Sequence, residues 1–132
     1  MSGWTIENNT FIDCQKGVFV GGGRKTRVVN NYFHQVDTAL HLDDRGLGWQ
    51  ASSCKPPAGV DYVNAVAFAQ LAAWAAYNIT VDHYCTPVYN VFADNTCCGC
   101  QAVSDFTAAQ AEGWLSSYLN NTEVCHSLSL RD

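Results

Sequence analysis

A 22-residue internal repeat is the feature that most restricts what this chain can fold into. Segment 28–46 repeats the pattern of segment 6–24, and a partial third copy begins at Phe92. At the 22-residue offset the matched pairs are Ile6 with Val28, Asn8 with Asn30, Asn9 with Asn31, Phe11 with Phe33, Val18 with Leu40, and Val20 with Leu42. A period of this length is typical of a solenoid, in which each repeat is one coil and equivalent residues stack.

The residues inside each copy predict short strands joined by turns. In segment 17–21, Val18 and Val20 alternate with other residues and therefore share one face of a strand. The asparagine rows suit tight turns, because asparagine tolerates a left-handed backbone. A β-hairpin or a chance match is the alternative, and the third copy argues against both. We predict an all-β solenoid, specifically a right-handed parallel β-helix of about three coils.

Breaks in the repeat divide the chain into three parts. Residues 1–49 carry coils one and two, and residues 50–86 form an insertion. This insertion begins with a loop rich in Ser, Pro and Gly, and its Ala-rich segment 61–77 predicts a helix. Residues 87–132 carry the third coil, a helix and a tail. That second helix is predicted over Thr107–Leu119, with Thr107 or Asp105 as its N-cap.

Cysteines and glycosylation sequons favour an oxidising compartment. The chain has seven cysteines and three Asn-x-Thr sequons, which begin at Asn8, Asn78 and Asn120. No signal peptide opens the chain, so we expect a piece of a longer secreted glycoprotein. The odd number of cysteines agrees with that expectation, since one partner can lie outside the chain.

Charge and hydropathy exclude two classes of partner. The net charge of −5 argues against nucleic-acid binding, which needs an excess of Lys and Arg. No stretch of about 18 apolar residues predicts insertion into a membrane. We expect a monomer or part of a longer chain, with no cofactor.

Three segments resemble a known family of right-handed β-helix repeat proteins. The segments are 8–11 (Asn-Asn-Thr-Phe), 17–24 (Gly-Val-Phe-Val-Gly-Gly-Gly-Arg) and 41–49 (His-Leu-Asp-Asp-Arg-Gly-Leu-Gly-Trp), and Pro87-Val88-Tyr89-Asn90 looks like the return to the coil. The resemblance covers roughly residues 4–49 and 87–100. It implies membership of the pectate-lyase-like superfamily, which includes polysaccharide lyases, polygalacturonases and proteins without known activity. Its members usually have more coils than three.

The candidate site lies where coils one and two end. If Val18 and Leu40 point inward, Phe19 and His41 point outward and stack, and Gly21 and Asp43 do the same. The predicted catalytic residues are His41, Asp43 and Asp44; the predicted substrate-binding residues are Phe19, Gly22, Arg24, Arg45 and Trp49. Aromatic rings stack on sugars, and Arg binds carboxylates through two hydrogen bonds. A structural corner held by Asp–Arg pairs is the alternative.

These residues leave several functions open. A hydrolase would use Asp43 and Asp44 as acid and base, provided that the strand has ended there. A lyase would use His41 or Arg45 as the base. A non-catalytic carbohydrate-binding or structural module is the other hypothesis. For the cysteines, including the C-x-x-C pair in 97–100, we predict disulfides, such as Cys54 with Cys85, and no metal.

Overall fold

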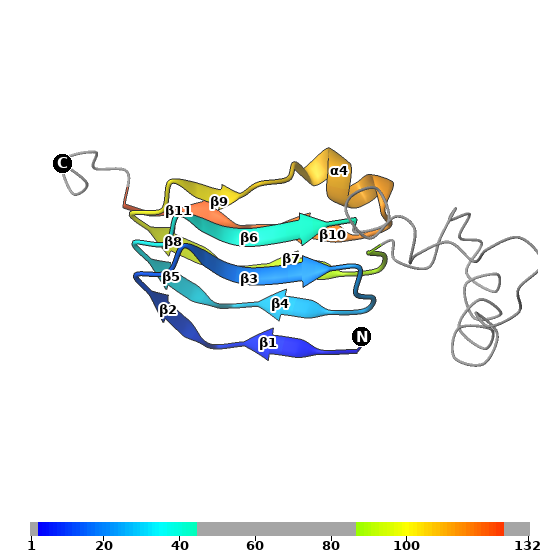
Figure 1. Ribbon diagram of the computed structural model, residues 1–132, viewed down its shortest axis with the longest axis horizontal. Coiled ribbons are helices and arrows are strands. Elements are labelled where there is room, and N and C mark those ends of the chain that lie inside the picture. The colour runs from blue at the N-terminus through cyan, green and yellow to red at the C-terminus, as the bar shows by residue number, and fades with distance from the viewer. Residues whose placement is uncertain (1–2, 45–86, 126–132) are drawn as a thin grey trace, which may run out of the picture. The chain divides into compact units, whose positions relative to one another are not determined.

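The computed structural model describes residues 3–44 and 87–125. Within these ranges the chain forms short strands and one helix, coloured along the chain in Figure 1. The strands are β1 (Thr5–Glu7), β2 (Thr10–Ile12), β3 (Lys16–Gly21), β4 (Arg27–Val29), β5 (Tyr32–His34), β6 (Thr38–Asp43), β7 (Val91–Ala93), β8 (Thr96–Cys98), β9 (Ala102–Ser104), β10 (Ser117–Leu119) and β11 (Thr122–Glu123), and the helix is α4 (Ala108–Gly113).

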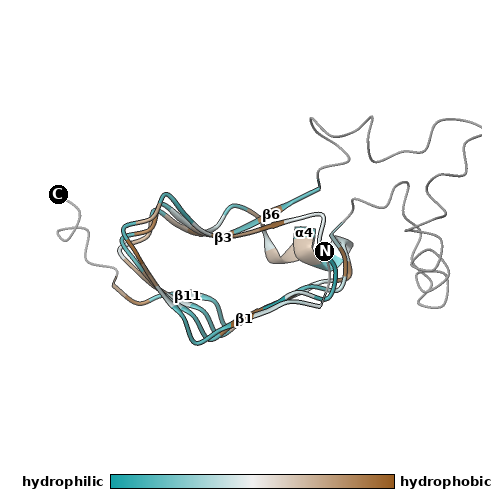
Figure 2. Cartoon of the chain, turned by 60° about the horizontal axis from the view of Figure 1, so that its bottom comes forward, coloured by the Kyte–Doolittle hydropathy of each residue, from teal (hydrophilic) through white to brown (hydrophobic). Residues whose placement is uncertain are grey.

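The strands form three parallel sheets. Their orders are β1-β4-β7-β10, β11-β8-β5-β2 and β3-β6-β9. The chain visits each sheet once and then begins the next round one strand further along, so successive rounds superpose in Figure 2. This arrangement of stacked parallel strands is compatible with the predicted all-β solenoid.

The strand register confirms the repeat. Ile6 pairs with Val28, Phe11 with Phe33, and Val18 with Leu40. The third copy continues the same rows, since Val28 pairs in turn with Phe92. The residues that recur in the sequence are therefore the residues that stack in space.

The core consists of the inward-facing rows. Val28, Phe33, Leu40 and Phe92 are completely buried, and Phe11 stacks on Phe33 with ring centroids 4.9 Å apart. Each such side chain contributes about 1.5–3 kcal/mol when it leaves water. The predicted inward direction of Val18, Val20, Leu40 and Leu42 is confirmed.

A ladder of asparagines joins the first two sheets. It comprises Asn9, Asn31, Asn95 and Asn121, and each side-chain Oδ1 from Asn31 onward accepts the backbone N–H of the preceding member. The residues just before the ladder are Asn8, Asn30, Asp94 and Asn120, and their φ angles of 55–58° are left-handed. Asparagine and aspartate tolerate this conformation better than most residues, which explains why they recur at the turn.

The predicted C-terminal helix is too long. Helix α4 begins at Ala108 and ends at Gly113, and Thr107 forms the predicted N-cap as part of a capping box with Gln110. Leu115 then takes a left-handed φ of 54°, which a continuing helix does not allow. The next residues, Ser117–Leu119, form β10 and pair with β7. Tyr118 is therefore the register partner of Phe92, and the chain starts a fourth coil that the 22-residue repeat does not predict.

Among the described strands, additional residues enter the coils at one corner, between the third sheet and the first. The asparagine ladder has sequence separations of 22, 64 and 26 residues, and the longer separations arise between β6 and β7 and between β9 and β10. The chain divides into two compact units, Met1–Asp43 with Pro87–Asp132, and Asp44–Thr86. The predicted helix over 61–77 and the predicted Cys54–Cys85 bond lie outside the described residues. No helix within the described ranges is long and apolar enough to cross a membrane.

Candidate functional site

Phe19 and His41 form a stacked pair on the outer face of the β3-β6-β9 sheet. They are register partners, and their ring centroids lie 4.3 Å apart with 25° between the planes. Phe19 remains 44% exposed, although its neighbours in β3 are buried. The predicted outward stacking of these two rings is confirmed. Together the rings offer an aromatic surface that includes the two imidazole nitrogens of His41.

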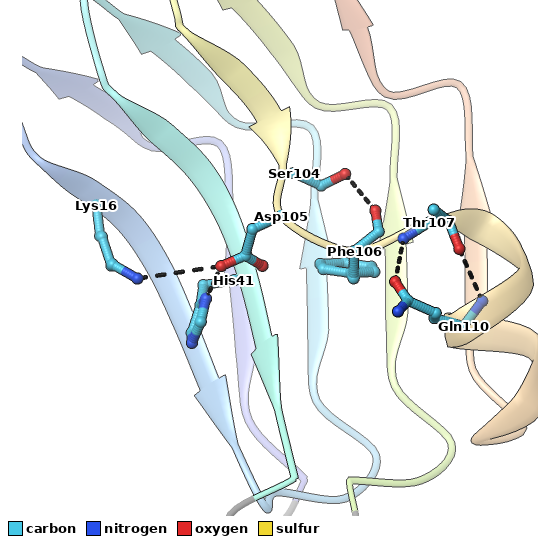
Figure 3. A network of polar contacts seen from close by, with 7 residues as sticks. All are labelled: Lys16, His41, Ser104, Asp105, Phe106, Thr107 and Gln110. Carbon is cyan, nitrogen blue, oxygen red and sulfur yellow. Dashed lines mark hydrogen bonds and ion pairs between the residues drawn. The ribbon is translucent and has the colours of Figure 1, made fainter.

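Asp105 contacts His41 directly. The His41 Nδ1 atom lies against the Asp105 Oδ2 atom, and the Lys16 Nζ atom is 4.0 Å from the same oxygen. Figure 3 shows the three side chains converging on the outer face, each from a different strand or its end. A carboxylate on Nδ1 orients the imidazole and leaves its Nε2 atom for another partner. The arrangement can therefore position a histidine as a proton acceptor.

Strand pairing and a local side-chain hydrogen bond hold Asp105 in place. Leu40 pairs with Ser104, so Asp105 comes level with His41, and its N–H donates to the Leu40 carbonyl over 3.2 Å. On the other side, Ser104 Oγ donates to the carbonyl of Phe106, whose ring is buried. The prediction had treated Asp105 only as a possible N-cap, a role that Thr107 performs.

The two predicted acidic residues Asp43 and Asp44 lie in different surroundings. Asp43 ends β6, pairs with Gly21 and is half-buried on the outer face, two residues beyond His41. Asp44 is only 7% exposed. A glycan on the outer face can therefore meet Asp43 and Asp105 more readily than the predicted pair Asp43 and Asp44.

The corner after β3 contains Gly22 and Arg24. Gly22 has a left-handed φ of 73° and donates its N–H to the Asp43 carbonyl over 3.1 Å. Burial lowers the pKa of Arg24 to about 10, so its guanidinium still carries a charge at neutral pH. The remaining predicted binding residues, Arg45 and Trp49, lie outside the described residues. The functional roles predicted for all these residues stay predictions.

Two disulfides lie beside β8 and β11, at one edge of the β11-β8-β5-β2 sheet. They join Cys97 to Cys100 and Cys98 to Cys125. The first spans the C-x-x-C pair seen in the sequence, and the second ties β8 to the segment after β11. Among the described cysteines, Cys14 is a free thiol.

Comparison with protein-family models, with curated proteins and with solved structures finds no match to this chain. Its function must therefore be inferred from the site.

Proposed function

We propose that this chain is part of a secreted right-handed parallel β-helix that acts as a lyase on an acidic polysaccharide. The observation that carries the proposal is the His41–Asp105 pair beside the stacked Phe19 ring and the Lys16 ammonium group. Support for the setting comes from the two disulfides and from the exposed sequon asparagines Asn8 and Asn120.

In this proposal each residue of the outer face has one task. Phe19 stacks on a sugar ring, as aromatic side chains do with apolar sugar faces. The Lys16 ammonium group attracts the sugar carboxylate, because opposite charges attract and this side chain stays accessible. Asp105 holds the imidazole through Nδ1, so that the Nε2 lone pair of His41 points to substrate.

The proposed reaction is a β-elimination. The His41 Nε2 atom takes the C5 proton, which is acidified by the adjacent carboxylate. The electron pair of that C–H bond forms the C4–C5 double bond, and the C4–O glycosidic bond breaks. The departing oxygen takes a proton from solvent, and His41 returns its proton to solvent. No oxidant or reductant is needed.

The effect of His41→Ala tests the proposal. The chain is incubated with polygalacturonate, alginate and a neutral glucan, and the absorbance of unsaturated products is recorded. Loss of a general base should lower the rate about 10²–10⁴-fold. The matched control is His34→Ala, which removes a histidine of the same coil from a different sheet and should leave the rate unchanged.

Other results of this experiment would indicate a different function for the chain. New reducing ends without unsaturation would identify a hydrolase, for which Asp43 and Asp105 are the available carboxylates. Binding without products, weakened by Phe19→Ala, would identify a carbohydrate-binding module, an alternative that the exposed Phe19–His41 stack favours. Neither product nor binding with any acidic glycan would refute the proposed function.

A further inference from the structure

An inward-facing row of the β11-β8-β5-β2 sheet changes from aromatic rings to a sulfur and a carboxylate along its length. The row contains Phe11, Phe33, Cys97 and Glu123, which are successive register partners. Its first two members stack as rings, whereas a sulfur and a carboxylate follow where further rings would continue the core. A carboxylate at such a position calls for a compensating partner, because burying a charge is costly.

The Glu123 carboxylate is anchored by three backbone N–H groups. Oε1 accepts from Gly99 and Cys125, each over 3.1 Å, and Oε2 accepts from Cys100 over 3.2 Å. A carboxylate offers about four lone-pair positions, so Oε2 retains one for a further partner. The bonds fix the carboxylate beside the C-x-x-C pair.

The ligand atoms of Cys97, Cys100 and Glu123 all lie within 4.8 Å of one another. Ligands of a tetrahedral zinc ion, with Zn–S bonds of about 2.3 Å and Zn–O bonds of about 2.0–2.2 Å, lie roughly 3.3–3.8 Å apart. The Cα atoms of Cys97 and Cys100 lie 5.8 Å apart, so rotation of the two side chains after the disulfide opens would let the sulfurs separate to that distance. Thiolates also favour zinc over calcium or magnesium.

We propose that the reduced chain binds one zinc ion through Cys97, Cys100 and Glu123, with water as the fourth ligand. A reductant such as a dithiol or a phosphine first supplies two electrons to the S–S bond, and two protons complete the thiols. Zinc binding then releases those two protons and leaves two thiolates. The disulfide and the zinc site are therefore mutually exclusive states of the same residues, and this inference is independent of the proposed glycan chemistry.

Cobalt titration of the whole chain tests this site. The protein is reduced with a phosphine without oxygen, the reductant is removed, and Co²⁺ is added as a spectroscopic probe. One Co²⁺ per chain should bind with thiolate-to-cobalt absorption, and Zn²⁺ should displace it. The oxidised chain should bind none at this site. Alkylation with mass spectrometry gives a second measurement, since Zn²⁺ should protect Cys97 and Cys100.

Three variants separate this site from other thiols. Glu123→Gln keeps the size of the side chain but removes its charge, and should weaken Co²⁺ binding at least 10-fold. The double variant Cys97→Ser with Cys100→Ser should abolish the cobalt absorption. The control combines Cys14→Ser, Cys54→Ser and Cys85→Ser, and should keep it. Absorption that survives the loss of Cys97 and Cys100, equal affinity in Glu123→Gln, or no binding by the reduced chain would overturn the proposal.

Discussion

Replacing Asn95 by alanine is expected to lower the free energy of unfolding by about 2–5 kcal/mol. The Asn95 side chain is 1% exposed and makes four hydrogen bonds. Its Oδ1 accepts from the backbone N–H and the side-chain amide of Asn31, and its amide donates to the Val28 carbonyl and to the Asn121 side chain. Alanine removes all four, and the N–H of Asn31 then stays buried without its acceptor.

The loss is large because domains of this size are stable by only about 5–15 kcal/mol. Urea unfolding followed by far-UV circular dichroism measures it. The matched control is Asn9→Ala, which removes the exposed first member of the same ladder and should cost about 1 kcal/mol or less. Equal losses for the two variants would show that the buried hydrogen bonds of the ladder do not stabilise the fold.

Gly17→Ala is expected to destabilise the chain by about 1–3 kcal/mol, chiefly through overpacking. A Cβ atom at this position would lie close to the Phe33 ring and 2.6 Å from the Ala39 carbonyl oxygen. Neither neighbour can move away easily. Phe33 is completely buried and stacked on Phe11, and the Ala39 carbonyl is part of the paired backbone of β6. Thermal unfolding should show a lower midpoint.

Gly113→Ala provides the comparison for this substitution. Gly113 is the last residue of α4, and a Cβ atom there would meet nothing within 4 Å. Alanine favours helices over glycine by up to about 1 kcal/mol, so this variant should be neutral or slightly more stable. An unfolding temperature of Gly17→Ala equal to that of the wild type would contradict the predicted steric clash between residue 17 and Phe33.

The sequence predicted the coils where the repeat spacing is constant. Between coils one and two no residue is added, so the 22-residue offset alone brings Phe19 onto His41 and Val18 onto Leu40. The 22-residue repeat does not predict the fourth coil, because α4 lengthens the offset between the third and fourth coils to 26 residues. The sequence contains a signal for this coil, since Asn120-Asn121-Thr122 repeats Asn8-Asn9-Thr10, but the same tripeptide also fits a glycosylation sequon.

Half of the candidate site could be predicted for the same reason. Phe19 and His41 belong to the constant-offset part of the chain, whereas Asp105 lies 64 residues beyond His41, across the insertion. The sequence reveals this offset only if Asn95 is aligned with Asn31, which are also 64 residues apart, and the same offset is then applied to His41. Asp44 follows the last residue of β6, so the alternation of residues along that strand does not predict its burial.

The corner that accepts extra residues is also a practical attachment point. Within each of the first three coils, the three strands follow one another at the same residue spacing. The segment that returns from the third sheet to the first differs in length from coil to coil. A protein engineer could graft a peptide epitope or a fluorescent label at the exposed residues Glu112 and Gly113 of the return that contains α4, where added residues already leave the strands on either side paired.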